Sequence, residues 1–306
     1  MKNFLIYLGS LLLSVIFFLG VGEYLARQAP NPYKYKEEWM QIHHSEVNTL
    51  VLGGSQCFYG IKPELLSGVS FNLANVSQGL KYDLFLLKRY DCPKLKTVII
   101  PISYPTLFAG KLENGREWYR AIFYKIYMDY PEHSIFSKYN YEFSNHRTFM
   151  GKILKLILGS TDIGYDEWGW GNNYLLRNKN IKNWDSGEEA RIAIERHTYH
   201  DLSRAEVNYT TLVQLIKECK KRKVNLVLIT TPCWHVYNEM LNKQQYSKMV
   251  EIINEVVKEY RITYIDYSRD SRFEANDFYD SNHLSDIGAD KFSRILNEDL
   301  KNYNDE

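Results

Sequence analysis

The sequence predicts an α/β protein built on a parallel β-sheet with helices on both faces. Two observations support this fold class: short apolar segments that end at turn residues, and amphipathic helical patterns between them. Strands that are apolar throughout are typical of a parallel sheet covered on both faces, because both of their sides are buried. The predicted strands are Thr49–Gly53, Val69–Leu73, Thr97–Ile102, Val224–Thr230 and Thr263–Asp266.

Three helices are predicted in the second half of the chain, where apolar residues recur every three or four positions. The segment Ala205–Lys223 ends in four basic residues, which suit the negative end of the helix dipole. The segment Gln244–Tyr260 repeats the apolar pattern. The last predicted helix is Asp286–Leu300, with Asp286 as its candidate N-cap.

The composition is that of a folded protein with a large core. Of the 306 residues, 45% are apolar and 25% are charged, which fits one large domain with an insertion or two smaller domains. The net charge of +1 argues against nucleic acid as a partner. The 25 tyrosines contribute to an aromatic fraction of 15%, and such rings suit sugar binding and interfaces as well as a wet core.

The four cysteines, Cys57, Cys92, Cys219 and Cys233, lack the spacing of metal ligands, so we expect no metal and no other cofactor. Two disulfides would be possible outside the cytoplasm. We expect buried free thiols instead, because Cys219 and Cys233 occupy apolar positions of predicted core elements.

An uncharged apolar segment, Phe4–Gly22, lies near the start of the chain. As a helix it spans roughly 28 Å, close to the ~30 Å thickness of the hydrocarbon layer. We expect an uncleaved transmembrane anchor over residues 1–27; a cleavable signal peptide is the alternative, which the poor cleavage sequence disfavours. Because Lys2 precedes the apolar segment, we expect the short N-terminus to be cytoplasmic. The rest of the chain is then extracytoplasmic, on the periplasmic or cell-surface side. Residues 28–47 are predicted to be a tether and residues 48–306 the main domain.

Residues 109–204 interrupt the alternation of strands and helices. They contain aromatic clusters at Trp118-Tyr119, Tyr139–Tyr141 and Trp168–Gly171, and one apolar helix near Lys152–Leu158. An insertion at this point is predicted to form a cap over the carboxyl ends of the strands, where ligands bind in open α/β sheets. Its aromatic side chains, Trp168 and Trp170 among them, either grip a saccharide or form the cap's own small core.

A serine near the start of the chain and a histidine near its end supply a nucleophile and a base. Ser55 follows the first strand after two glycines, and Asp280 and His283 stand three apart before the last helix. A serine hydroxyl becomes nucleophilic when an imidazole removes its proton and a carboxylate fixes the imidazole tautomer. We therefore predict a catalytic triad of Ser55, Asp280 and His283. Core packing is favoured for the nearby Cys57 over a role as second nucleophile.

These motifs resemble those of the SGNH/GDSL hydrolase superfamily, and most closely its membrane-anchored, DltD-like and alginate-acetylation-like members. Gly53-Gly54-Ser55 matches the first block of the family, and Asp280, His283 and Gly288 match its last block. The resemblance covers about residues 48–108 and 224–296. It implies a flavodoxin-like three-layer sandwich and a place beside polysaccharide export and acyl-transfer machinery.

The inner blocks depart from the family pattern. Ser77 stands where the family has a glycine whose N–H binds the oxyanion; Gly79 is nearby, and a serine N–H can still donate. The asparagine of the third block is absent, which leaves Ser103 or Tyr104 as the other donor. The resemblance thus implies an oxyanion hole made from the N–H of Ser55 with Ser77, Gly79 and Ser103. Loss of one donor costs about 10²–10³ in rate.

The leading hypothesis is a membrane-anchored serine O-acyltransferase or esterase that acts on an extracytoplasmic glycan through an acyl-serine intermediate. The resemblance implies the carbohydrate acceptor and a multi-spanning membrane acyltransferase as partner, whereas the residues imply only the acyl-serine. The alternatives are a non-catalytic scaffold of a polysaccharide-modifying complex and a lipid or lysophospholipid esterase. His235 follows the fourth strand and is a candidate for substrate contact, although a structural hydrogen bond is favoured. His197 and His200 are expected on the surface.

Overall fold

The computed structural model of the chain describes all residues except 132–136, 161–162, 180–186 and 305–306. The chain divides into two compact units. The anchor unit comprises Met1–Glu37 and Glu113–Ile163, and the sheet unit comprises Glu38–Leu112 and Gly164–Glu306. The β-sheet and the three predicted catalytic residues all belong to the sheet unit.

Five parallel strands form the sheet, in the order β2-β1-β3-β4-β5. All five strands predicted from the sequence are present, so the predicted α/β fold class is confirmed. This strand order is that of flavodoxin-like folds, in which ligands bind where the order reverses, between β1 and β3. The strands are β1 (Thr49–Val51), β2 (Ser70–Asn72), β3 (Thr97–Pro101), β4 (Asn225–Thr230) and β5 (Thr263–Asp266).

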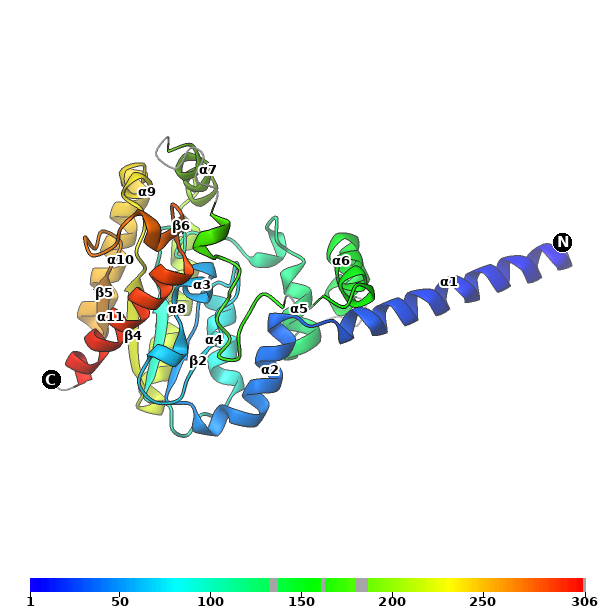
Figure 1. The fold of residues 1–306 in the computed structure, drawn as a ribbon, viewed down its shortest axis with the longest axis horizontal. Coiled ribbons are helices and arrows are strands. Elements are labelled where there is room, and N and C mark those ends of the chain that lie inside the picture. The colour runs from blue at the N-terminus through cyan, green and yellow to red at the C-terminus, as the bar shows by residue number, and fades with distance from the viewer. Residues whose placement is uncertain (132–136, 161–162, 180–186, 305–306) are drawn as a thin grey trace. The chain divides into compact units, whose positions relative to one another are not determined.

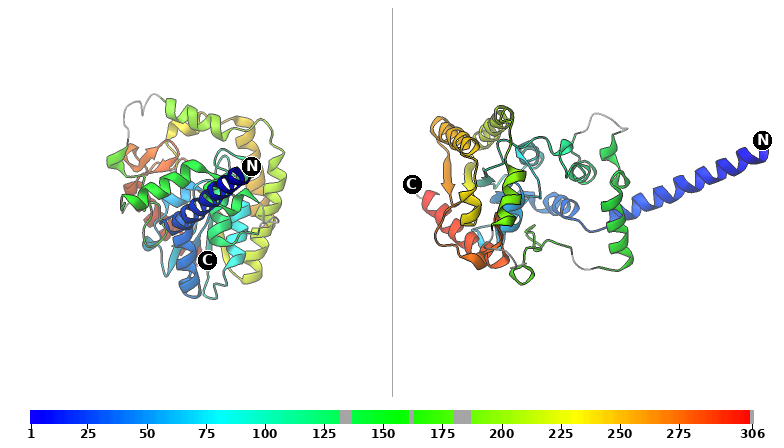
Figure 2. Two further views of the ribbon diagram at one scale, coloured as in Figure 1. Left: turned by 90° about the vertical axis from the view of Figure 1, so that its right-hand side faces the viewer. Right: turned by 90° about the horizontal axis from the view of Figure 1, so that it is seen from above.

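Helices cover both faces of this sheet (Figures 1 and 2). On one face α8 packs against both α4 and α10, and on the other face α3 packs against α11. The three helices predicted in the second half of the chain are present as α8, α10 and α11. The bounds are α3 (Ser55–Gly60), α4 (Leu80–Arg89), α8 (Arg204–Arg222), α10 (Lys243–Tyr260) and α11 (Asp286–Asn304).

The start of α11 differs from the prediction in its cap. Ser285 rather than Asp286 caps the helix, because the Ser285 hydroxyl accepts the backbone N–H of Gly288 at 3.3 Å. The Asp286 carboxylate instead accepts the backbone N–H of Leu176 at 2.7 Å and holds a distant loop.

Smaller elements complete the sheet unit. A two-stranded antiparallel hairpin follows β5 and carries the predicted Asp and His of the triad. The smaller elements are α7 (Glu188–His197), α9 (His235–Glu239), β6 (Phe278–Asp280), β7 (His283–Leu284) and the 3₁₀ turns η1 (His44–Glu46), η2 (Pro63–Leu65), η6 (Leu176–Asn178) and η8 (Ala275–Asp277).

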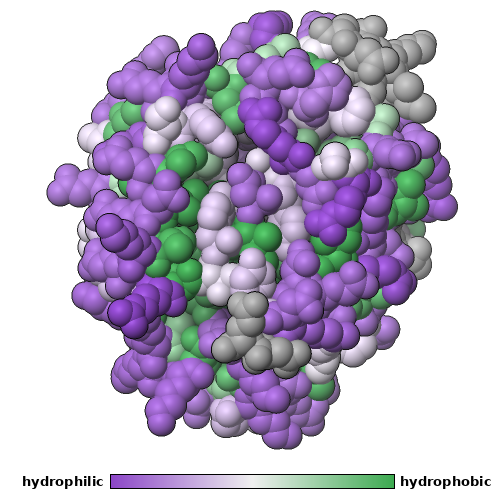
Figure 3. Space-filling view, turned by 90° about the vertical axis from the view of Figure 1, so that its left-hand side faces the viewer, coloured by the Kyte–Doolittle hydropathy of each residue, from purple (hydrophilic) through white to green (hydrophobic). Residues whose placement is uncertain are grey.

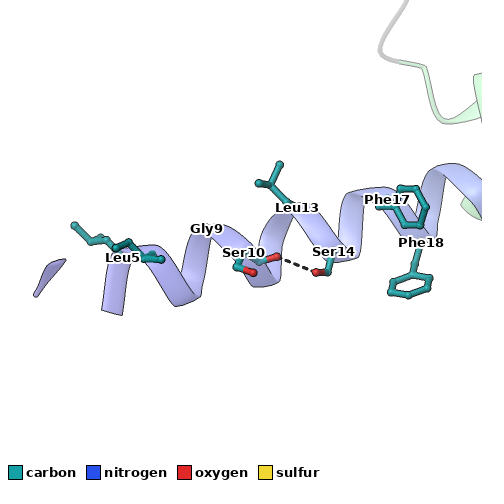
Figure 4. A pocket seen from close by; sticks show the side chains of 8 residues that line it. Leu5, Gly9, Ser10, Leu13, Ser14, Phe17 and Phe18 are labelled. Atoms are coloured by element: carbon teal, nitrogen blue, oxygen red, sulfur yellow. Dashed lines mark hydrogen bonds between the residues drawn. The ribbon is translucent and has the colours of Figure 1, made fainter. Parts of the chain in front are cut away.

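The anchor unit is helical and is built around α1 (Lys2–Gln28), with α5 (Arg120–Met128), α6 (His146–Ile157) and the turns η4 (Lys138–Asn140) and η5 (Glu142–Ser144). Among the described residues, α1 is the one helix long and apolar enough to cross a membrane, and its apolar side chains are exposed. A shallow apolar hollow runs along its flank (Figure 4), where the Ser14 hydroxyl donates to the Ser10 carbonyl at 2.9 Å. A helix of this kind is a signal sequence or a membrane anchor.

Two segments differ from their predicted form. The expected tether contains α2 (Pro32–His43), and Pro32 at its first position removes an N–H that would have no helical partner. Residues 109–204 do not form one cap, because residues 113–163 belong to the anchor unit and the chain from Gly164 onward belongs to the sheet unit.

Candidate active site

The chain turns sharply between β1 and α3 and presents Ser55 as the first residue of α3. Gly53 adopts a φ of +105°, and a Cβ atom there would lie 2.2 Å from the ring of Pro101, so only glycine fits the turn. Because Ser55 begins the helix, its backbone N–H has no intrahelical acceptor. The turn therefore presents both a hydroxyl and an N–H at the edge of the sheet.

The three predicted triad residues lie together. Ser55 Oγ is 2.7 Å from His283 Nε2, and His283 Nδ1 is 2.8 and 2.9 Å from the two carboxylate oxygens of Asp280. Asp280 ends β6 and His283 begins β7, so one tight hairpin supplies both base and carboxylate. These contacts match the order nucleophile, base and orienting carboxylate that acyl transfer requires.

The environment of Asp280 favours the carboxylate that a triad needs. Burial raises the pKa of Asp280. The neighbouring His283, which also donates a hydrogen bond, and the backbone N–H of Asn282 lower it by more, so the pKa lies below its ordinary value. A carboxylate that accepts from Nδ1 keeps the proton on that nitrogen and leaves Nε2 as an acceptor. Nε2 can then take the hydroxyl proton of Ser55.

Three contacts hold the loop that joins the two triad residues of the hairpin. The Gln56 side chain donates to the Asn282 carbonyl at 3.1 Å. The Ser281 N–H donates to the Glu189 carboxylate at 2.9 Å, and the Ser281 carbonyl accepts from the N–H of Trp234 at 2.9 Å. The base is thus tied to α3, α7 and the start of α9. Sequence analysis did not find these residues, which lie in no local motif.

Three stacked tyrosines line one side of the imidazole. The ring of Tyr174 lies between Tyr59, at 3.8 Å and 13°, and Tyr279, at 4.3 Å and 14°. The His283 ring meets Tyr174 edge-on at 5.2 Å and 82°. The stack restricts how the imidazole can turn, and the half-buried Tyr174 places flat apolar surface beside it.

The loop predicted to supply oxyanion donors lies beside the nucleophile turn, since the N–H of Asn75 donates to the Gly53 carbonyl at 3.1 Å. Within this loop Ser77 is exposed and adopts a left-handed φ of 60°. Gly79 precedes α4 as its N-cap. This loop therefore lies next to Ser55 and to the Ser55 backbone N–H, which is the first N–H of α3.

The two side chains considered for the missing asparagine are engaged elsewhere. The Ser103 hydroxyl bonds to Thr106 Oγ1 at 2.8 Å, and the same oxygen accepts the N–H of Ser103 at 3.0 Å. The Tyr104 hydroxyl bonds to Thr198 and accepts the N–H of Asn242. Both residues therefore stabilise turns, and we leave them out of the proposed oxyanion hole.

Trp168 and Trp170 do not present a pair of exposed rings on which a saccharide could stack. This corrects the saccharide-binding interpretation of the Trp-Gly-Trp segment. Trp170 is buried and its indole N–H donates to the Tyr59 carbonyl at 2.6 Å. Gly169, at a φ of +80°, approaches the end of β2 so closely that a Cβ would lie 2.4 Å from the Asn72 carbonyl oxygen. Trp168 is half-buried and its carbonyl accepts the Asn72 N–H. This segment thus packs as part of the sheet unit.

The remaining histidines and the cysteines lie outside the triad. His235 is exposed on α9, 3.0 Å from the carboxylate of Glu239, as the structural interpretation expected. His197 is half-buried rather than exposed: it bonds to the Tyr237 hydroxyl at 2.8 Å, and burial lowers its pKa to about 4. All four cysteine thiols are free and buried, and burial raises the pKa of Cys57 well above its ordinary value.

A buried carboxylate beneath the nucleophile turn is a further residue that sequence analysis missed. Asp83 in the first turn of α4 accepts the N–H of Gly53 at 2.8 Å and the side-chain amide of Gln78 at 2.7 Å. It links the nucleophile turn to the loop 74–79. Burial raises the pKa of Asp83 from 3.8 to about 7, although both hydrogen bonds oppose the shift.

Asp83 should make the protein less stable as the pH rises. Between pH 3.8 and about 7 the unfolded chain has released this proton and the folded chain still holds it, so the free energy of unfolding falls by about 4 kcal/mol across the range. Asp83→Asn keeps an oxygen that accepts both hydrogen bonds but does not titrate. Denaturant unfolding from pH 4 to pH 8 should show the variant gaining stability relative to wild type. The prediction would be contradicted if the free energies of unfolding of Asp83→Asn and wild type changed with pH in parallel. The same relative gain in the surface control Asp290→Asn would contradict it too.

Comparisons with known proteins give the following similarities. A family model described as a protein of unknown function (DUF1574) matches residues 176–300. None of the curated proteins matches the chain. A candidate acylhydrolase from Bacteroides fragilis is 9% identical with a TM-score of 0.43, and the match covers 87% of this chain and 95% of that one.

Two further solved structures are similar. A candidate platelet-activating-factor protein from Streptococcus pneumoniae is 11% identical with a TM-score of 0.42 over 96% of this chain and 98% of that one. A point mutant of an acetyl-xylooligosaccharide esterase from Geobacillus stearothermophilus is 13% identical with a TM-score of 0.37 over 82% and 93%.

Proposed function

We propose that this protein is a membrane-anchored serine esterase or O-acyltransferase that works through an acyl-Ser55 intermediate. The single observation that carries the proposal is the chain of contacts from Ser55 Oγ through His283 to Asp280, with spacings of 2.7 and 2.8 Å. A scaffold that had lost its chemistry would have no need for a hairpin held by three further hydrogen bonds.

In the first step His283 Nε2 takes the proton of Ser55 as Oγ forms a bond to the carbonyl carbon of an acyl ester. The negative charge that develops on the carbonyl oxygen faces the N–H of Ser55 and the loop 74–79. When the tetrahedral intermediate collapses, the ester C–O bond breaks and His283 gives its proton to the departing alcohol. Asp280 stabilises the imidazolium throughout without taking its proton.

In the second step water or a sugar hydroxyl attacks the acyl-serine. His283 takes the proton of the attacking oxygen and returns one to Ser55 Oγ, which releases an acid or a new ester. Transfer requires an acceptor held in place, because water at ~55 M otherwise reacts first. A glycan acceptor is supported by the half-buried Tyr174, which meets the imidazole edge-on, and by Tyr279, which stacks on Tyr174.

The anchoring part of the proposal is carried by α1, whose apolar surface is exposed along its length. We place the sheet unit on the extracytoplasmic side from Lys2 and the charge rule. A multi-spanning acyltransferase that delivers the acyl group stays a prediction, to be sought by crosslinking in the native membrane.

A fluorophosphonate probe tests the proposal directly, because it bonds covalently only to an activated serine. We expect one probe per chain, located on Ser55 by peptide mass spectrometry, and strong loss of labelling in His283→Ala. The matched control is Ser247→Ala, which removes an exposed serine on α10 and should label as wild type does. Absence of labelling in a folded wild-type protein would favour the scaffold alternative.

A further inference from the structure

Helix α6 buries a charged side chain among its inner residues and exposes several large apolar side chains on its outer side. Its inner face holds Lys152, which pairs with the fully buried carboxylate of Glu142 and donates to the Tyr127 hydroxyl. Its outer face exposes Met150 (59%), Leu154 (55%) and Ile157 (76%), which lie on one side of the helix at steps of four and three residues. A helix that borders water would place these residue types the other way round.

The position of α6 along the chain's membrane helix is fixed by contacts within the anchor unit. The helix runs across the C-terminal end of α1 (Figures 1 and 2). A Cβ atom on Gly22 of α1 would lie 2.9 Å from the ring of Phe149 of α6. The apolar run of α1 ends at Gly22, so in a bilayer spanned by α1 this crossing would lie where the hydrocarbon layer ends and the headgroups begin.

An exposed aromatic pair lies at the same level. The Glu23 carboxylate, one residue beyond Gly22, accepts the backbone N–H groups of Glu142 and Phe143 at 3.1 and 3.2 Å. The rings of Tyr141 and Phe143 stack at 5.1 Å and remain more than a third exposed. Aromatic rings are enriched at this depth of a bilayer, where an apolar body and polar surroundings coexist.

Two further observations favour a lipid surface as the partner of α6: its exposed basic residues, and the more hydrophilic surface of the sheet unit. Arg147 and Lys155 are exposed on α6 next to its apolar side chains, where they can meet anionic headgroups. The face of the sheet unit beside β5 and α11 is mostly hydrophilic, with smaller hydrophobic patches between (Figure 3).

We propose that α6 is a second membrane element that lies in the interfacial layer of the bilayer crossed by α1, with Met150, Leu154 and Ile157 among the lipid chains. The inference goes beyond the catalytic proposal and rests only on its anchoring part. A helix in this position needs apolar side chains on its outer face, toward the lipid, and its charged group paired on the inner face. The buried ion pair keeps α6 in place, because breaking such a pair is costly. The loop with Tyr141 and Phe143 would then extend the same contact.

The test places an environment-sensitive dye on single introduced cysteines in the full chain, in vesicles of phosphatidylcholine and phosphatidylglycerol. Leu154→Cys reports α6, Leu12→Cys reports the middle of α1, and Val207→Cys on α8 is the matched control; their side chains are 55%, 54% and 54% exposed. Labelled wild type gives the baseline for the four buried native thiols. Ile157→Cys serves as a second α6 site, and thermal unfolding followed by circular dichroism shows that each variant is folded.

Lipids with nitroxide groups at shallow or deep chain positions then quench the dye. We expect shallow nitroxides to remove about half of the Leu154→Cys signal, since interfacial helices sit ~5–10 Å deep. Deep nitroxides should quench Leu12→Cys, and neither should quench Val207→Cys. If Leu12→Cys is quenched while Leu154→Cys and Ile157→Cys match the control, the anchor stands and this inference fails. If the α6 dye is shielded from water but not quenched by lipid, a second copy covers the face and the inference fails. If no site is quenched, the anchoring part of the proposed function fails too.

Discussion

Replacing Ser55 with alanine should reduce kcat for p-nitrophenyl acetate by about 10⁴–10⁶-fold, because the proposed acyl-enzyme can no longer form. The neighbouring Cys57 cannot take over, since its thiol is buried and burial raises its pKa. The free energy of unfolding should change by no more than about 1 kcal/mol, because only one hydrogen bond, to His283, is lost. Turnover and thermal unfolding measured on the same preparation separate the two effects.

Two matched variants sharpen this experiment. Ser247→Ala removes an exposed hydroxyl of α10 and should keep full turnover. Ser55→Cys keeps a nucleophile at the same position and should retain a thioester intermediate that mass spectrometry can detect. A folded Ser55→Ala protein with turnover near the wild-type rate would show that the 2.7 Å contact with His283 is not the reacting pair.

The sheet and the long helices of the sheet unit could be predicted because their signals are local. The strands are short β-branched runs closed by turns, and α8, α10 and α11 repeat apolar residues at helical spacing. The division of residues 109–204 between two units could not be predicted in this way. It depends on tertiary bonds such as that of the Trp170 indole to Tyr59, which no spacing in the sequence indicates.

The meeting of Ser55, Asp280 and His283 could also be predicted, because Ser55 follows a strand directly and the other two share one hairpin. Parallel strands end at one edge of a sheet, so residues that follow them meet there. The side chains that support the triad carry no such signal. Asp83 lies on an amphipathic helix where a carboxylate would usually face water, and its burial becomes visible only with its bonds to Gly53 and Gln78.

Replacing Asp280 with asparagine should lower kcat by about 10⁴-fold while leaving Ser55 and His283 in place. The carboxylate now accepts from Nδ1 of His283 through both oxygens, at 2.8 and 2.9 Å, so the proton stays on Nδ1. An asparagine can present its amide N–H to the ring, which places the proton on Nε2 instead. That nitrogen would then donate to Ser55 Oγ and could not accept its proton.

Asp290→Asn is the matched control, because Asp290 is a half-exposed carboxylate on α11 that pairs with Lys62, away from the imidazole. It should turn over substrate within about two-fold of wild type, since surface ion pairs contribute little. Proton NMR gives a second readout: the low-field signal of the Nδ1 proton should be present in wild type and Asp290→Asn, and absent in Asp280→Asn. If Asp280→Asn loses that signal but keeps its rate within ten-fold, the tautomer does not limit the reaction, and His283 must be oriented by the tyrosine stack alone.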